Sequence, residues 1–128
     1  MEQKKIKEFT DLMAWQEAHK LVISIYAMVK SFPNNENFGL TSQMQRAAVS
    51  ITSNIAEGFG RQGYKEKVHF YYLAHGSLTE LKNQLYVARD VGYIGSEEFN
   101  KNIKQLSTAH KLLQGLLKKS KSFLNHES

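Results

Sequence analysis

Apolar residues recur at steps of three and four through most of the chain, which is the spacing of one face of an α-helix. The pattern predicts a first helix over 11–32, which Pro33 ends because proline cannot continue a helix. Further helices are predicted over 41–58, 65–91 and 96–124. The predicted core positions are Leu12, Trp15, Ala18, Val22, Ile25, Val29, Phe32, Met44, Ala48, Ile51, Ile55, Val68, Tyr71, Ala74, Leu78, Leu81, Leu85, Ala88, Phe99, Ile103, Leu106, Leu113 and Leu117.

Polar and glycine residues mark where the first two helices begin and end. Thr10 or Asp11 is expected to cap the first helix, because short oxygen-bearing side chains accept hydrogen bonds from the first backbone N–H groups. Thr41 or Ser42 is expected to cap the second in the same way. Gly58 stands where a left-handed residue often ends a helix.

The remaining boundaries set the architecture. Gly92 is expected to end the third helix, and Ser96 begins the fourth. Four amphipathic helices joined by short connections predict an all-α protein, an up-down-up-down antiparallel four-helix bundle. We expect this domain over 10–124, between flexible tails at 1–9 and 125–128.

Composition narrows the classes of function. The chain has 128 residues and no cysteine, which excludes disulfides, thiolate zinc sites, iron–sulfur clusters and cysteine nucleophiles. No apolar run approaches the roughly 18 to 20 residues that a membrane span needs, so we expect a soluble, cytoplasmic protein without a membrane partner. The net charge of +5 permits a polyanionic partner without requiring one.

Basic residues concentrate in two places. After Asn100 only Glu127 opposes the lysines of the fourth helix, so this face is either a solvated surface or a phosphate-binding one. A second group of basic residues lies at the start of the third helix. Unpaired backbone N–H groups there could hold a phosphate, or the basic residues simply face solvent. The candidate phosphate-contacting residues are Arg61, Lys65, Lys67, Lys104, Lys111 and Lys118.

Motifs for nucleotide binding, metal binding and nucleophilic catalysis lack the surrounding residues or elements that these functions need. Residues 58–63 match G-x-G-x-x-G, but helical spacing precedes them where a dinucleotide-binding fold needs a strand, so we interpret them as a glycine-rich turn. The five histidines form no H-x-x-x-H or H-E-x-x-H pair, and we expect no metal and no cofactor. Ser50 and Ser53 lack the surroundings of an activated nucleophile. We therefore expect no enzymatic activity.

Two further surfaces are predicted. The third helix carries more apolar residues than one bundle face requires, which favours self-association through Phe70, Tyr72, Leu73 and Tyr86. On the first helix, Leu21, Ile23 and Met28 are expected to point outward in the same way. The second helix has a polar stripe that consists of Arg46, Ser50, Asn54 and Glu57. Either the stripe faces solvent, or Arg46 and Glu57 pair with groups on neighbouring helices or subunits.

Several of these segments together are typical of one family. They are Trp15, GLTSQ at 39–43, RAAVSI at 46–51, SNIAEG at 53–58 and GSLTEL at 76–81. Over about 9–122 the chain resembles the four-helix bundle proteins encoded in intervening sequences of bacterial 23S ribosomal RNA genes, often called S23 ribosomal proteins. Thr52 stands where this family commonly has proline, a departure that affects only the local shape of the helix.

The resemblance implies an up-down bundle assembled as a ring-shaped homo-oligomer, usually a pentamer, without catalytic activity. The family is similar to the accessory proteins of diversity-generating retroelements, which form basic pentamers that bind nucleic acid and a reverse transcriptase. Our leading hypothesis is a non-enzymatic protein that binds RNA or DNA through phosphates. The alternative is a scaffold that docks a nucleic-acid-processing protein such as a polymerase, with incidental charge.

Overall fold

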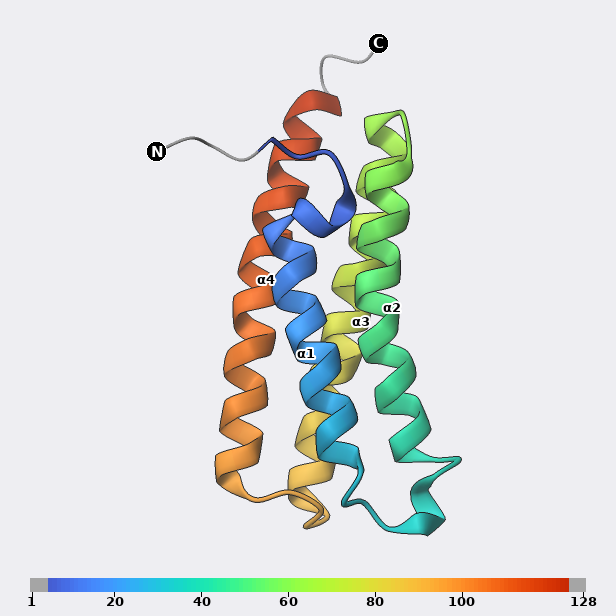
Figure 1. Cartoon of the computed structure of the whole chain (residues 1–128), viewed down its shortest axis with the longest axis vertical. Coiled ribbons are helices and arrows are strands. Elements are labelled where there is room, and N and C mark those ends of the chain that lie inside the picture. The colour runs from blue at the N-terminus through green and yellow to red at the C-terminus, as the bar shows by residue number, and fades with distance from the viewer. Residues whose placement is uncertain (1–4, 125–128) are drawn as a thin grey trace.

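The computed structural model describes residues 5–124, which form an antiparallel bundle of four helices (Figure 1). The helices are α1 (Met13–Val29), α2 (Leu40–Gly60), α3 (Tyr64–Asp90) and α4 (Ser96–Leu124), with short 3-10 helices η1 (Phe9–Asp11) and η2 (Asn34–Glu36). The beginning of α1, the α2–α3 turn and the end of α4 lie at the same end of the bundle (Figure 1). The predicted all-α four-helix fold is confirmed.

Each helix packs against two neighbours. The α1 and α3 helices each contact both α2 and α4, and the diagonal pairs do not contact one another within the described residues. Nearly all predicted core positions are buried; Leu12, Trp15 and Ile103 are partly buried and pack against the core. The helical spacing of apolar residues therefore predicted the buried faces correctly.

Two residues of α1 were predicted on the wrong side. Leu21 and Met28 were expected to point outward, yet they are 0% and 4% exposed and belong to the core. The reason is that α1 buries two adjacent faces, one against α2 and one against α4. Only Ile23 of that predicted set is exposed.

The predicted caps of α1 and α2 are wrong. Neither helix has a side-chain hydrogen bond from its N-cap residue, which is Leu12 for α1 and Gly39 for α2. The Asp11 carboxylate instead accepts the N–H groups of residues 7 and 8, which stabilises η1. At the start of α2, the Glu36 carboxylate accepts the N–H of Leu40 at 3.1 Å. Glu36 thus takes the place of the predicted cap of α2, whereas Asp11 stabilises η1 and leaves the start of α1 without a side-chain cap.

Gly58 does not adopt a left-handed conformation, so its predicted role is also wrong. The α2 helix continues through Gly60, and Gly58 is buried within it. A Cβ atom at Gly58 would lie 2.6 Å from Cε1 of Tyr71 and 3.1 Å from Cβ of Phe70. Gly58 therefore permits α2 and α3 to approach closely.

The predicted glycine end of α3 is confirmed. Gly92 has a φ of 85°, the only positive φ among the described residues. Its N–H donates to the carbonyl of Arg89 at 3.0 Å, and the N–H of Tyr93 donates to the carbonyl of Ala88 at 2.9 Å. These two bonds form a Schellman motif, which satisfies carbonyls at the helix end.

At the ends of the chain, the predicted tail residues 1–4 and 125–128 lie outside the described residues. Phe9, which was expected in the first tail, belongs to η1, and its ring packs edge-on against Trp15 at 5.5 Å. No helix within residues 5–124 is long and apolar enough to cross a membrane.

Candidate nucleic-acid interface

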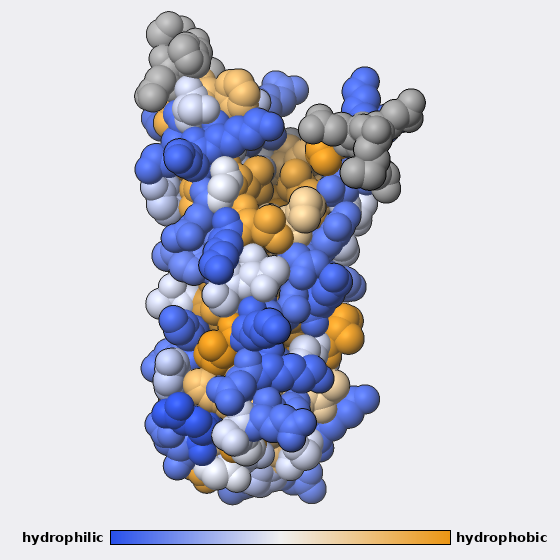
Figure 2. Space-filling model, turned by 90° about the vertical axis from the view of Figure 1, so that its left-hand side faces the viewer, coloured by the Kyte–Doolittle hydropathy of each residue, from blue (hydrophilic) through white to orange (hydrophobic). Residues whose placement is uncertain are grey.

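Three predicted phosphate contacts lie in line on α4. Lys104, Lys111 and Lys118 are all exposed, and none forms an ion pair with another residue in 5–124. Because seven residues make nearly two helical turns, their side chains leave the same face at intervals of about 10 Å. Figure 2 shows that hydrophilic residues cover most of the face that carries α4.

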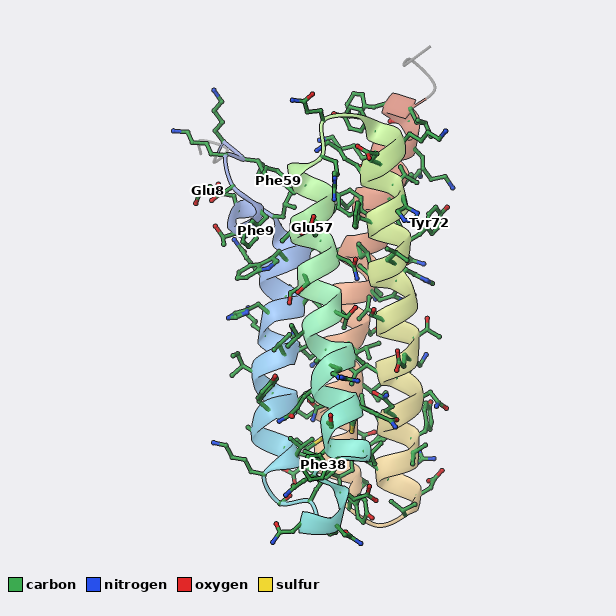
Figure 3. All side chains as sticks on the ribbon, turned by 90° about the vertical axis from the view of Figure 1, so that its right-hand side faces the viewer. Glu8, Phe9, Phe38, Glu57, Phe59 and Tyr72 are labelled. Atoms are coloured by element: carbon green, nitrogen blue, oxygen red, sulfur yellow. The ribbon has the colours of Figure 1, made fainter. Side chains whose placement is uncertain are left out.

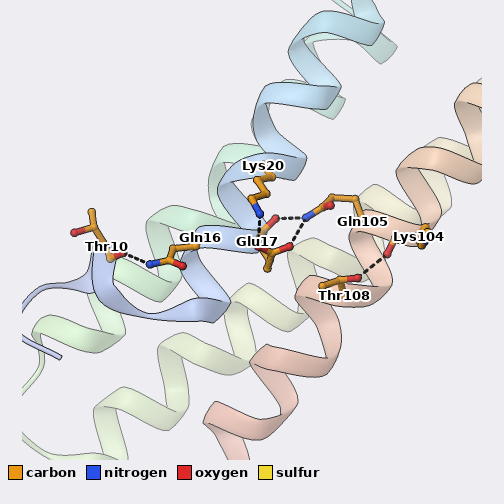
Figure 4. Close-up of polar contacts among 7 residues, drawn as sticks. All are labelled: Thr10, Gln16, Glu17, Lys20, Lys104, Gln105 and Thr108. Carbon is orange, nitrogen blue, oxygen red and sulfur yellow. Dashed lines mark hydrogen bonds and ion pairs between the residues drawn. The ribbon is translucent and has the colours of Figure 1, made fainter. Parts of the chain in front are cut away.

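Contacts with α1 fix the rotation of α4 that exposes these lysines. Gln105 Nε2 donates to the carbonyl of Glu17 at 2.8 Å and to its Oε1 at 3.2 Å (Figure 4). Lys20 forms an ion pair with the other carboxylate oxygen at 2.7 Å. The hydrogen bonds from Lys20 and Gln105 lower the pKa of Glu17. Glu17 is therefore engaged by these two residues and does not neutralise Lys104.

In the second basic group, at the start of α3, Lys67 stabilises the fold. Lys67 Nζ donates to the carbonyl of Phe59 at 2.7 Å and of Gly58 at 3.4 Å. A cation at these carbonyls stabilises the negative end of the α2 dipole. Burial lowers the pKa of Lys67. Its ammonium group is thus a cap of α2.

Arg61 and Lys65 differ in their surroundings. Arg61 forms an ion pair with Glu57 at 3.2 Å, and its guanidinium carbon lies 4.6 Å from the ring centre of Phe70. Phe9, Glu57 and Arg61 are among the residues that line a depression of about 590 Å³. Figure 3 shows Phe9 and Glu57 near this end of the bundle. Lys65 is exposed and has no ion pair within the described part of the chain. Of the three residues in this group, Lys65 is the one whose charge is not engaged by another described residue.

A groove between α3 and α4 was not predicted. It has a volume of about 310 Å³ and is lined by Tyr72, His75, Gln114, Leu117, Lys118 and Lys121. Lys121 Nζ donates to the Tyr72 hydroxyl at 2.7 Å and lies 5.4 Å from its ring centre. These partners are 49 residues apart in sequence, so spacing within a single helix could not predict the contact.

The predicted interface residues of α3 are mostly exposed. Tyr72, Leu73 and Tyr86 are 49%, 44% and 40% exposed, and Figure 3 shows Tyr72 at the edge of the bundle. Phe70 is only partly exposed, because Arg61 covers its ring. Exposed apolar side chains therefore occur near both ends of α3.

The charged residues of the polar stripe of α2 face solvent, and its middle contacts α3. Ser77 of α3 donates a hydrogen bond to Ser50 Oγ at 2.8 Å, and Asn54 Nδ2 donates to the same oxygen at 3.1 Å. Arg46 and Glu57 are exposed, and Glu57 pairs only with Arg61 within its own helix turn. The middle of the stripe thus links α2 to α3, and its ends face solvent.

In the sequence, no two histidines have the spacing of metal ligands on one helix. The described residues contain no cluster of three or more His, Cys, Asp or Glu side chains suited to a metal ion. Two histidines from different helices nevertheless lie together. His75 Nε2 of α3 is 3.1 Å from His110 Nε2 of α4.

Comparison with known protein families identifies the family of this chain. A family model described as "23S rRNA-intervening sequence protein" matches residues 10–115. The chain belongs to this family. The match includes all four motifs on which the resemblance rested, from 39–43 to 76–81, and the family identification is confirmed.

A solved member of the S23 ribosomal protein family has the same fold. It is a protein of unknown function from Bacteroides thetaiotaomicron, whose crystal structure was determined at 1.70 Å resolution. It is similar with a TM-score of 0.76 and 21% sequence identity, covering 82% of this chain and 95% of that chain. At this identity the likeness supports the four-helix fold alone. No curated protein is significantly similar to this chain.

Proposed function

We propose that this member of the 23S rRNA-intervening sequence family is a non-enzymatic protein that binds RNA or DNA through backbone phosphates. The observation that supports this most is the line of Lys104, Lys111 and Lys118 on α4, exposed and without ion pairs within residues 5–124. Phosphates are the one feature that every nucleic acid repeats along its length, so an evenly spaced row of cations suits them.

The chemistry of this face favours contact with the backbone over reading of bases. Lysine ammonium groups on flexible stems contact phosphates without regard to sequence. No arginine occurs in α4 to make the bidentate contacts that recognise guanine. In this proposal Lys65 adds a contact at the end of the bundle where α4 finishes, and Arg61 and Lys67 chiefly stabilise the α2–α3 turn.

The test compares charge reversal of lysines on α4 with charge reversal of lysines outside α4. A labelled RNA hairpin and a labelled DNA duplex are titrated by fluorescence anisotropy at low salt with the wild type and with K104E/K111E/K118E. The matched control, K5E/K7E/K30E, carries the same change of charge on other exposed lysines. We expect at least a tenfold loss of affinity in the first variant and a much smaller loss in the control. Equal losses, or no binding by the wild type, would refute the proposal.

We further propose that the chain forms a ring-shaped homo-oligomer through the exposed apolar surface of α3. Tyr72, Leu73 and Tyr86 support this, because large exposed apolar patches are uncommon on monomers. The family resemblance implies a pentamer, which would carry about +25 from +5 per chain, a field that attracts polyanions. Light scattering on the eluting protein should give a multiple of 14.7 kDa for the wild type and a smaller mass for L73E/Y86E. A wild-type monomer at micromolar concentration would contradict this.

The same surface supports a second candidate function. A scaffold that docks a nucleic-acid-processing protein such as a polymerase would use the exposed tyrosines and have no affinity for nucleic acid of its own. It predicts that the lysine reversals leave the partner complex intact, whereas substitution of Tyr72 and Tyr86 dissociates it. Loss of the complex with the lysine variant would favour the nucleic-acid proposal.

A further inference from the structure

Two imidazole rings from neighbouring helices face each other at the groove between α3 and α4. The Nε2 atoms of His75 and His110 are 3.1 Å apart, and the ring centres are 4.9 Å apart with planes inclined at 50°. Both residues are half-buried, and His75 lines the groove of about 310 Å³. The pair is therefore held between two helices and is reachable from solvent.

The geometry of the two rings matches that of two ligands on a common ion. A straight N–H···N bond of this length would hold the ring centres about 5.4 Å apart, because each nitrogen lies about 1.15 Å from the centre of its ring. Two imidazoles bound to one ion at about 2.05 Å, with the same separation of nitrogens, hold their centres about 4.8 Å apart. The observed 4.9 Å agrees with the second arrangement.

We propose that His75 and His110 are the two protein ligands of a transition-metal site that bridges α3 and α4. The nitrogen separation of 3.1 Å corresponds to an angle of about 98° at the ion, between the values for square-planar and tetrahedral coordination. The described residues offer no third His, Cys, Asp or Glu to such an ion, so water fills the other positions.

The two imidazole nitrogens determine which metals the site prefers. Imidazole suits Cu²⁺, Ni²⁺ and Zn²⁺, and Cu²⁺ binds most tightly in this series, whereas Mg²⁺ and Ca²⁺ prefer oxygen ligands. Lys118 and Lys121 line the same groove, and Lys82 acts electrostatically on His110. These cations oppose a further positive charge, which restricts the site to metals with a strong preference for imidazole.

Both rings supply their lone pairs without a change in net charge. Without metal, one Nε2–H donates to the other Nε2; when metal binds, that ring carries its proton on Nδ1 instead, and both Nε2 lone pairs face the ion.

Copper titration of the full chain tests the site. CuSO₄ is added to the wild type, H75Q, H110Q and H69Q at pH 7, with calorimetry for affinity and electron paramagnetic resonance for bound nitrogens. His69 is the matched control, since it is an exposed histidine on α3 outside the pair. We expect one Cu²⁺ per chain with two imidazole nitrogens, at least a tenfold loss of affinity in H75Q and H110Q, and no change in H69Q.

Two results would overturn the proposal. One is copper binding by H75Q/H110Q that equals binding by the wild type, which would place the ion at other groups of the chain. The other is a wild-type spectrum with fewer than two imidazole nitrogens. Far-UV circular dichroism checks that the variants retain their helices, and the wild-type nitrogen count decides the matter where they do not. Nucleic-acid binding does not enter any of these measurements.

Discussion

Gly58 is a single residue on which the packing of two helices depends. A methyl group there would lie 2.6 and 2.9 Å from two ring carbons of Tyr71, which is 2% exposed, so the ring or the helix backbone would have to shift. We expect Gly58→Ala to lower the free energy of unfolding by about 1–3 kcal/mol, the usual cost of overpacking, despite the higher helix propensity of alanine. Urea denaturation followed by circular dichroism measures the change.

Gly60 provides the control in the same helix. A Cβ atom at Gly60 would contact nothing within 4 Å. Gly60→Ala should therefore leave stability unchanged or raise it slightly. If Gly58→Ala were as stable as Gly60→Ala, the close approach of α2 and α3 at Tyr71 would be wrong.

His110 makes stability depend on pH. Its pKa in the folded chain is lowered from 6.5, first by burial and then by His75 and Lys82. Between that lowered value and 6.5 the unfolded chain binds more protons than the folded one, so stability falls as the pH falls through this window. Glu17 and Glu36, whose pKa values lie below 4.5, remain charged there. When unfolding is measured at pH 7.5 and 5.5, H110Q should lose less free energy of unfolding on acidification than the wild type. Equal losses in the two proteins would contradict this role of His110.

At the residue scale, the sequence predicted most of the buried apolar positions but not the hydrogen-bond partners of buried polar residues. The steps of three and four placed residues such as Ile25, Leu81 and Leu113 in the core, where all three are fully buried. Asn102, also 0% exposed, was not foreseen, because its burial depends on Ser24 of α1, which donates to its Oδ1 at 2.7 Å. A polar residue in an apolar stripe is recognisable as buried only once its partner on another helix is known.

At the scale of elements, the end of α2 depends on a side chain from α3. Lys67 donates to two carbonyls of α2, at 2.7 and 3.4 Å. We expect Lys67→Met to lower the free energy of unfolding by about 1 kcal/mol, because those carbonyls lose a charged donor. Lys65→Met, at an exposed neighbouring position, should change stability by less than about 0.5 kcal/mol. Thermal unfolding of both variants measures the difference, and equal effects would show that Lys67 is not a cap.

The helices themselves were predictable, but the ends of α1 and α2 were not. The spans of α3 and α4 agree with the prediction, and Gly92 ends α3 as expected, since both depend on local sequence. The start of α2 depends instead on Glu36 in the preceding turn, and the Asp11 carboxylate binds N–H groups before η1 instead of those that begin α1. Local sequence does not show which backbone N–H groups a nearby side chain reaches.

At the scale of the whole molecule, sequence reasoning predicted the candidate interface only in part. The lysines of α4 were foreseen because charge imbalance is visible in sequence, and all three stand exposed in the bundle. The division of the other group was not foreseen, since Lys67 donates to a carbonyl that the α2–α3 turn brings near, and Arg61 is engaged by Glu57 one helical turn away. The His75–His110 pair, 35 residues apart, was missed for the same reason.

The salt dependence of nucleic-acid binding tests most directly whether the α4 lysines contact phosphates. Each phosphate neutralised contributes about 0.7 to 0.9 to the slope of log K against log salt. We predict that K104E/K111E/K118E lowers this slope by about 2 to 3 relative to the wild type, while K5E/K7E/K30E changes it by less. Identical slopes for the wild type and K104E/K111E/K118E, or wild-type binding that does not vary with salt, would contradict the prediction.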